Sequence, residues 1–226
     1  MYDLVLIDAD NTLFDYNKAE AYALENSLRV FGFQGDLNKL RQDYNVINKN
    51  LWQLLEKGDI KKEELSEKRF KQLFEKYDLD IPPKAFSQKY LAYLGQSNFL
   101  MKDALEIIQY LYKNYTVIIV TNGIKDVQFS RLEKSTIKDY NHGVVVSEDI
   151  GVSKPDPDFF VHALNIANHQ EKASTIIIGD SLSSDIQGGI NFGIDTCWFN
   201  YDNSDPETQL EPTYQIKALK EIYNIL

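Results

Sequence analysis

The sequence predicts an α/β protein in which a doubly wound parallel sheet carries an inserted unit of four helices. Short apolar runs rich in branched residues alternate with helix-length amphipathic segments, as in sheets built from β-α-β units. One long stretch, residues 16–96, lacks such runs and instead spaces its large apolar residues at helical intervals. We therefore expect an α/β core made of residues 1–15 and 97–226, and a helical insertion made of residues 16–96.

The first expected strand covers residues 4–7, a run of four apolar residues that ends at an acidic cluster. Further strands are expected at residues 116–120, 144–146, 175–178 and 195–199, and helices near residues 102–112, 127–132, 157–167 and 185–192. Strands that read as continuous apolar runs are typical of a parallel sheet covered on both faces. Residues 200–213 are predicted as a polar loop interrupted by proline, and residues 216–226 as a closing helix.

Within the insertion, two breaks separate helical segments. Gly58-Asp59 and Ile81-Pro82-Pro83 are expected joints, because glycine commonly ends a helix and proline cannot continue one.

Composition excludes several classes of protein. Hydrophobic residues make up 43% and charged residues 26%, so the chain can bury a globular core. The 24 basic and 34 acidic residues give a net charge of −10, which opposes binding to a nucleic acid polymer or an anionic membrane. No apolar run approaches the roughly 18 residues that span a bilayer. The only cysteine, Cys197, cannot form an intrachain disulfide, and we expect a reducing, cytoplasmic location.

Two carboxylates follow the first expected strand. Asp8 and Asp10 lie two positions apart, so in extended backbone their side chains point the same way. Their repulsion would be relieved by a hard divalent cation such as Mg²⁺, which prefers oxygen ligands. Taken alone, the same residues also suit an ordinary turn at a strand end.

Three later strand ends add polar groups. Thr121 and Asn122 suit a phosphate oxygen or a simple turn, and Lys154 could neutralise charge or be an ordinary surface lysine. Asp180 follows another strand, and Asp185 could ligate a metal or begin a helix. Because the carboxyl ends of parallel strands share one edge of a sheet, these groups are expected to converge there.

The four groups, in this order, resemble the motifs of the haloacid dehalogenase-like hydrolase superfamily. The matching positions are Asp8-x-Asp10-x-Thr12, Thr121-Asn122, Lys154-Pro155 and Gly179-Asp180-x-x-x-x-Asp185. The resemblance spans essentially the whole chain and implies a Rossmann-like core with a class I helical cap, which the insertion would form.

The resemblance also implies a role for each catalytic residue. Asp8 would be the nucleophile that attacks phosphorus and becomes an aspartyl phosphate. Asp10 would protonate the leaving oxygen and then deprotonate water. Thr121, Asn122 and Lys154 would bind the phosphoryl group.

In the same family pattern, Mg²⁺ is the expected cofactor. It would be held by the carboxylates of Asp8 and Asp180 and the backbone carbonyl of Asp10, with Asp185 binding through a water or through its neighbours.

Residues of the insertion and of the later core resemble the YjjG-type subgroup, whose characterised members are 5′-nucleotidases that include noncanonical pyrimidine nucleotides among their substrates. The matching segments are residues 48–52, 54–58, 65–70, 147–151 and 190–198. Asp10 favours phosphate chemistry, because dehalogenases of the superfamily lack this second aspartate. The expected partner is a small-molecule phosphomonoester, and the expected state is a monomer or a weak homodimer.

Two alternatives remain open from the sequence. A phosphosugar or other small-metabolite phosphatase or mutase would use the same core residues with a different cap. A phosphorylatable receiver-like signalling domain shares the acids, threonine and lysine but has no helical insertion. Trp52 could stack on a nucleobase while the amides of Asn48 and Asn50 read the base edge, or Trp52 could pack inside the cap.

Overall fold

The computed structural model describes residues 1–56, 58–204 and 210–226. The chain divides into two compact units: a core unit, Met1–Tyr16 with Asn98–Leu226, and a cap unit, Asn17–Ser97. Within the described residues, no helix is long and apolar enough to cross a bilayer.

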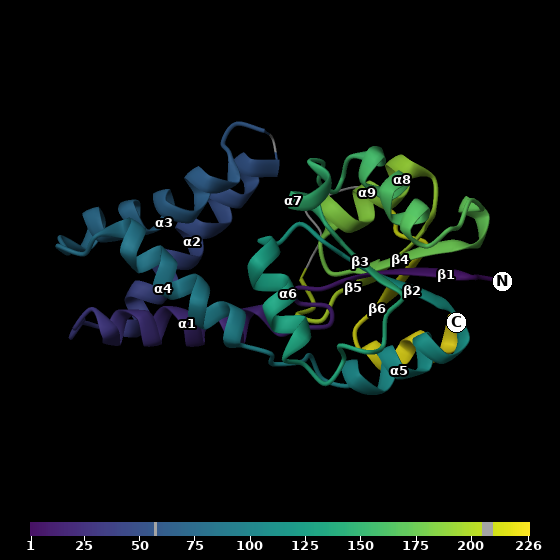
Figure 1. Ribbon diagram of the computed structural model, residues 1–226, viewed down its shortest axis with the longest axis horizontal. Helices are drawn as coiled ribbons and strands as arrows, with labels where there is room; N and C mark the ends of the chain where they lie inside the picture. The colour runs from purple at the N-terminus through teal and green to yellow at the C-terminus, as the bar shows by residue number, and fades with distance from the viewer. Residues whose placement is uncertain (57, 205–209) are drawn as a thin grey trace. The chain divides into compact units, whose positions relative to one another are not determined.

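The core unit contains a parallel sheet, so the predicted α/β class is confirmed (Figure 1). Six strands of the described chain stand in the order β3-β2-β1-β4-β5-β6. Their bounds are β1 (Leu4–Asp8), β2 (Thr116–Thr121), β3 (Gly143–Val146), β4 (Thr175–Gly179), β5 (Asp195–Phe199) and β6 (Tyr214–Ile216).

Strand β1 lies at the centre of the sheet and is buried along its whole length. Its alternating side chains serve two separate cores: Val5 and Ile7 belong to one cluster, and Leu4 and Leu6 to the other. This is why the strand reads as an uninterrupted apolar run in the sequence.

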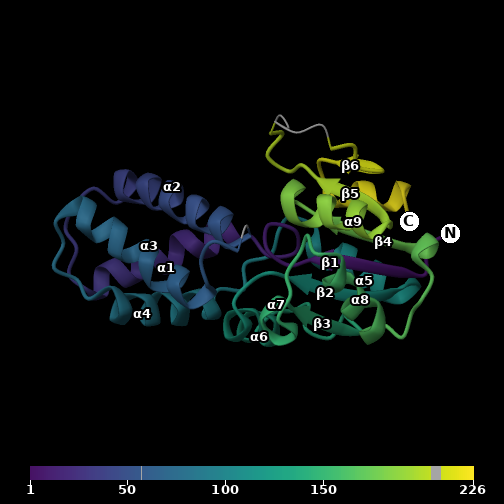
Figure 2. The same ribbon diagram turned by 90° about the horizontal axis from the view of Figure 1, so that it is seen from above.

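Helices cover both faces of the sheet (Figure 2). The core helices are α5 (Ala104–Asn114), α6 (Lys125–Glu133), α7 (Ser147–Ile150), α8 (Pro157–Ile166) and α9 (Gln187–Phe192), with short turns η1 (Lys172–Ser174), η2 (Leu182–Ile186) and η3 (Leu219–Asn224). Helix α5 and turn η3 pack on the Val5 face, and α8 with the end of α9 packs on the Leu4 face.

The prediction for the C-terminal segment was wrong in part. Instead of a closing helix over residues 216–226, the chain adds edge strand β6 and then the short 3₁₀ turn η3. Only Ile216 of the three β6 residues is fully buried, so the strand is too short to leave a recognisable pattern. The loop expected at residues 200–213 includes residues 205–209, which lie outside the described residues.

The cap unit contains the four predicted helices in its described residues: α1 (Tyr16–Val30), α2 (Leu37–Glu56), α3 (Lys62–Tyr77) and α4 (Pro83–Gln96). Gly58 adopts a positive φ of 78° after α2, and Pro83 is the first residue of α4. Aromatic rings fill the interior of the cap unit. The centre of the Phe70 ring lies 4.8 Å from that of Phe86 and 5.0 Å from that of Tyr90.

Strand register determines which residues share the carboxyl edge of the sheet. Asp8 pairs with Val120, so Thr121 lies one residue further along β2. On the other side Ile7 pairs with Ile178, which places Gly179 level with Asp8. The motif residues on three neighbouring strands therefore end at one edge.

Candidate active site

Lys154 joins two carboxylates at this edge of the sheet. Its Nζ lies 2.7 Å from Asp8 Oδ1 and 2.6 Å from Asp185 Oδ1, and it donates a third hydrogen bond to the Val120 carbonyl at 3.2 Å. The lysine side chain is 1% exposed, so these charges face one another away from water. The structure thus brings together residues that lie 146 and 31 positions apart in the chain.

The loop that carries Lys154 is held by Asn122. The Asn122 amide donates to the Lys154 carbonyl at 2.8 Å and accepts from the Lys154 backbone N–H at 2.9 Å. Both ends of the amide are therefore engaged with backbone, so the side chain joins two loops at the sheet edge. Beside it, the Thr121 hydroxyl accepts a hydrogen bond from the Gly123 N–H at 3.0 Å.

Asp185 is fully buried on the turn η2, a single π-helical turn of the kind often found at functional sites. Its Oδ2 accepts a hydrogen bond from the Ser181 N–H at 3.1 Å, while its Oδ1 contacts Lys154. Gly179 makes this placement possible, because a Cβ there would lie 2.2 Å from Asp185 Oδ2. The glycine of the Gly179-Asp180 motif is thus a packing requirement of Asp185, six residues later.

Three carboxylates form one acidic cluster. Asp8, Asp180 and Asp185 each offer an oxygen, and these oxygens all lie within 4.8 Å of one another. Asp8 and Asp185 are buried and Asp180 is half-buried. One lysine balances one of three negative charges, so the cluster has the excess charge and the oxygen donors that suit a hard divalent cation such as Mg²⁺.

The protonation behaviour of the cluster reflects this crowding. Burial raises the pKa of Asp8 to about 7, against the opposing effect of Lys154. Burial and then the charges of Asp8 and Asp185 hold the pKa of Asp180 well above its ordinary value. Burial alone would lower the pKa of Lys154, but the two neighbouring aspartates raise it above its ordinary value, so its ammonium stays charged.

Asp10, the second acid of the first motif, is held by two residues that our sequence reasoning missed. Gln128 Nε2 donates to Asp10 Oδ2 at 2.6 Å, and Arg131 Nη1 forms an ion pair with Asp10 Oδ1. Both residues lie on the buried side of α6, just after the Thr121-Asn122 motif. A glutamine and an arginine three positions apart on a helix are an available signal, because helix positions three apart share a face.

The cap unit has a polar group in its own interior. Asn48 donates to Glu20 Oε2 at 2.8 Å and accepts from Arg69 Nη1 at 3.3 Å. Trp52 packs against the apolar cluster of Leu51, Ile60 and Leu65. Asn48 and Trp52, two of the residues considered for base stacking or base reading, thus have contacts inside the cap.

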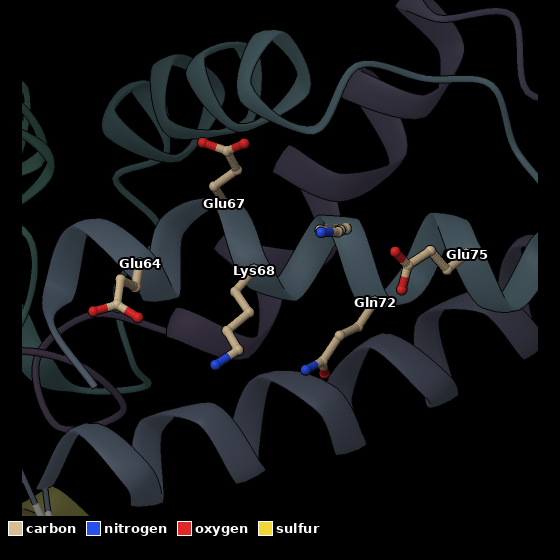
Figure 3. A pocket seen from close by; sticks show the side chains of 6 residues that line it. Glu64, Glu67, Lys68, Gln72 and Glu75 are labelled. Carbon is tan, nitrogen blue, oxygen red and sulfur yellow. The ribbon is translucent and has the colours of Figure 1, made fainter. Parts of the chain in front are cut away.

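The cap also carries a surface hollow of about 640 Å³. Figure 3 shows its lining side chains projecting from α3: Glu64, Glu67, Lys68, Lys71, Gln72 and Glu75. Acidic and basic groups are mixed along this single helix face, and none of them belongs to the four motifs that meet at the sheet edge. The hollow is therefore explained as the solvated face of α3.

Comparison with known proteins adds independent information. Residues 5–199 match the family model described as haloacid dehalogenase-like hydrolase. A protein named as a HAD-hydrolase, YfnB of Bacillus subtilis strain 168, is 34% identical over 100% of this chain and 95% of its own. Its magnesium-bound crystal structure, described as revealing interdomain movement, has a TM-score of 0.94 and covers 100% of this chain and 98% of that chain.

Two further relatives have names that state an activity. The pyrimidine 5′-nucleotidase PynA of Streptococcus pneumoniae R6 is 34% identical, covering 100% of this chain and 95% of its own. The pyrimidine 5′-nucleotidase YjjG of Escherichia coli K12 is 29% identical, covering 100% and 98%. The resemblance found in the motifs thus extends over full chain lengths.

Proposed function

The chain belongs to the haloacid dehalogenase-like hydrolase family, and from that premise we propose that it is a Mg²⁺-dependent phosphomonoesterase acting through an aspartyl phosphate on Asp8. The observation that carries the proposal is the buried Lys154 ammonium between Asp8 and Asp185, beside Asp180, at the carboxyl edge of the sheet. Phosphoryl transfer requires mainly positioning and neutralisation of negative charge, which this arrangement supplies.

In the first step, an Asp8 carboxylate oxygen attacks phosphorus, and the bond between phosphorus and the ester oxygen breaks. Asp10 gives its proton to the departing ester oxygen, which leaves as an alcohol. Lys154 Nζ, 2.7 Å from Asp8 Oδ1, offsets the charge that gathers as the anionic phosphoryl group approaches the carboxylate.

In the second step, water attacks phosphorus of the aspartyl phosphate, and the bond between phosphorus and the Asp8 oxygen breaks. Asp10, now a carboxylate, takes the proton from this water. Inorganic phosphate leaves, Asp8 is again a carboxylate, and Asp10 is again protonated for the next cycle.

The residues that would hold Mg²⁺ are Asp8, Asp180 and the backbone carbonyl of Asp10, with Asp185 supporting them. When bound, Mg²⁺ neutralises charge on the phosphoryl oxygens and on the acidic cluster. The geometry supports this assignment, because the oxygens of Asp8, Asp180 and Asp185 lie within 4.8 Å of one another beside a single lysine.

For the substrate we propose nucleoside 5′-monophosphates, with pyrimidine nucleotides first. Support comes from PynA and YjjG, two full-length relatives named as pyrimidine 5′-nucleotidases. Asp10 also supports phosphate esters over haloacids, since it supplies the proton that a departing alkoxide needs.

The test is release of inorganic phosphate from a panel of canonical and noncanonical nucleoside monophosphates and of phosphosugars, with Mg²⁺ or with EDTA. We expect Mg²⁺-dependent release from pyrimidine nucleotides and none from Asp8→Asn. Release from phosphosugars alone would support phosphomonoesterase activity but contradict the nucleotide substrate. No release from any ester would contradict phosphomonoesterase activity itself.

Two other expectations stay predictions: a cytoplasmic location, and a monomer or weak homodimer. Sedimentation of the purified chain over a range of concentrations tests the second.

A further inference from the structure

We propose that Gln128 and Arg131 of helix α6 are positioning residues that hold the Asp10 carboxylate in place for its two proton transfers. The inference rests on the proposed function, because Asp10 has those roles only if the protein transfers phosphoryl groups. Helix α6 carries none of the four motifs that resemble the superfamily pattern.

The two contacts engage both oxygens of one carboxylate. Gln128 Nε2 donates to Asp10 Oδ2 at 2.6 Å, and Arg131 pairs with Asp10 Oδ1. One contact alone would leave the carboxylate free to rotate about its last bond. Two donors from a single helix fix both its direction and its rotation, as paired hydrogen bonds to a carboxylate generally do.

Arg131 is itself held by the turn that carries Asp10. Its guanidinium carbon lies 4.6 Å from the centre of the Phe14 ring, a cation–π contact, and its side chain has no solvent exposure. The backbone N–H of Asn11 donates to the Phe14 carbonyl at 2.7 Å, which folds residues 10–14 back on themselves. The same short turn therefore presents both the carboxylate and the ring against which the arginine packs.

Space for Gln128 depends on a glycine in the neighbouring motif. A Cβ at Gly123 would lie 2.1 Å from Gln128 Nε2. Because Gly123 follows Thr121 and Asn122, the loop after β2 leaves room for the amide to reach Asp10.

A structural role for the pair is the simpler alternative, and the energetics weigh against it. Charged pairs removed from water stabilise a fold weakly, and apolar residues of similar size often replace them without loss. Helix α6 nevertheless buries Gln128 and Arg131 beside Val127, where apolar residues would anchor it. Their contacts converge on the one side chain assigned to proton transfer.

The two roles differ in a measurable way. A misplaced general acid slows cleavage of an ester with a poor leaving group, such as a nucleotide, and barely affects p-nitrophenyl phosphate, whose leaving group needs no proton. A misplaced general base slows hydrolysis of the aspartyl phosphate whatever the ester was. A loss of positioning therefore produces rapid first-turnover release of p-nitrophenolate followed by slow turnover.

The experiment compares Arg131→Met and Gln128→Met with wild type on p-nitrophenyl phosphate and on the nucleotide or alkyl phosphate that wild type hydrolyses fastest. We expect kcat for the poor leaving group to fall roughly 30- to 100-fold, in the range seen when a reacting group is displaced by about 1 Å. The first turnover of p-nitrophenyl phosphate should change less than about threefold, with a burst that wild type lacks. Arg131→Lys, which keeps a donor, should recover part of the loss.

Arg69→Met is the matched control, because Arg69 is also buried and also lies over aromatic rings, those of Phe70 and Tyr90 in the cap unit. It should lower the thermal midpoint and leave the ratio of the two substrates unchanged. Equal losses on both substrates without a burst, for either α6 variant, would overturn the inference and make the pair structural. Absence of phosphate release by wild type would instead refute the proposed function.

Discussion

At the scale of single residues, Lys154 offsets the electrostatic repulsion within the buried acidic cluster. It is the partner of two buried carboxylates, and its own pKa is raised by both of them. Removing one member of a buried ion pair costs more than the pair contributes, because the remaining charge keeps its desolvation penalty. Here the remaining charges are two carboxylates with Asp180 close by.

The first prediction concerns Lys154→Met. In EDTA we expect the free energy of unfolding to fall by about 3–5 kcal/mol, the usual cost of leaving a buried charge unpaired. Mg²⁺ should restore part of that loss, since a bound cation relieves the same repulsion. Phosphate release should fall by about 10²-fold or more, because the charge beside the nucleophile is lost.

Urea unfolding with EDTA and with Mg²⁺ measures the effect. Lys125→Met is the control: Lys125 pairs with Asp149 at an exposed site, so about 1 kcal/mol or less is expected. A Lys154→Met protein as stable as wild type in EDTA would contradict the argument.

The second prediction follows from Asp8. Burial raises its pKa to about 7 in the folded protein, against an ordinary value of 3.8, so the fold binds this proton more tightly than the unfolded chain does. The resulting stability is fully present below about pH 4 and is lost as the pH rises towards 7. A shift of this size corresponds to at most about 4 kcal/mol.

Other carboxylates titrate in the same range, so the quantity to measure is a difference. Urea midpoints of wild type and Asp8→Asn in EDTA, between pH 4.5 and 7.5, should show the wild-type advantage shrinking as the pH rises. An advantage that grows with pH would mean that Lys154 outweighs burial at Asp8.

At the scale of elements, the junction of β4 and η2 places Asp185 next to Gly179 in the site. Gly179 ends the strand, Ser181 caps the turn, and Asp185 folds back over the glycine. The third prediction is that Gly179→Ala displaces the Asp185 carboxylate from Lys154. The crowding should cost about 1–3 kcal/mol of stability, as overpacking in a tight core does, and phosphate release should fall with it.

Ser183→Ala is the control in the same turn, because Ser183 is exposed and its change should stay within about 0.5 kcal/mol. Thermal unfolding and phosphate release give the two readouts. A Gly179→Ala protein with wild-type stability would show that the turn can shift away from the new methyl group.

The same elements show what sequence patterns can and cannot reveal. Strands such as β1 and β4 were predictable because burial on both faces turns them into apolar runs, and the polar residues just beyond them mark the sheet edge. Strand β6 and turn η3 were not, because three residues with one buried side chain carry no period.

Helix α6 was predicted, near residues 127–132, but its contacts to Asp10 were missed for a different reason. Its buried face includes Gln128 and Arg131, which a search for apolar periodicity treats as solvent-facing. Likewise, the role of Gly179 depends on a contact with Asp185 that only the folded turn creates. Local sequence patterns therefore do not predict contacts that polar side chains make between different elements.

At the scale of the whole molecule, the motif residues and the interior of the cap lie in different compact units. Every motif residue belongs to the core unit, and the cap unit has its own aromatic interior and its own buried polar group. A ligand of the acidic cluster should therefore stabilise the core unit directly. The cap unit should be stabilised only to the extent that it unfolds together with the core unit.

The last prediction is that Mg²⁺ slows hydrogen exchange selectively. At a concentration about 100 times its dissociation constant, a ligand stabilises the folded state by about 2.7 kcal/mol, which corresponds to about 100-fold slower exchange of amides that open only with the bound unit. We expect this protection for β1, β2 and β4, which carry the cluster or border it, and much less for α2 and α3 of the cap.

Exchange measured by mass spectrometry on wild type, with Mg²⁺ and with EDTA, tests the prediction, and Asp180→Asn serves as the control that should lose the protection. Equal slowing in core and cap would mean that the two units unfold as one. No slowing in either, under conditions where phosphate release requires Mg²⁺, would mean that the cation binds only together with the substrate's phosphate.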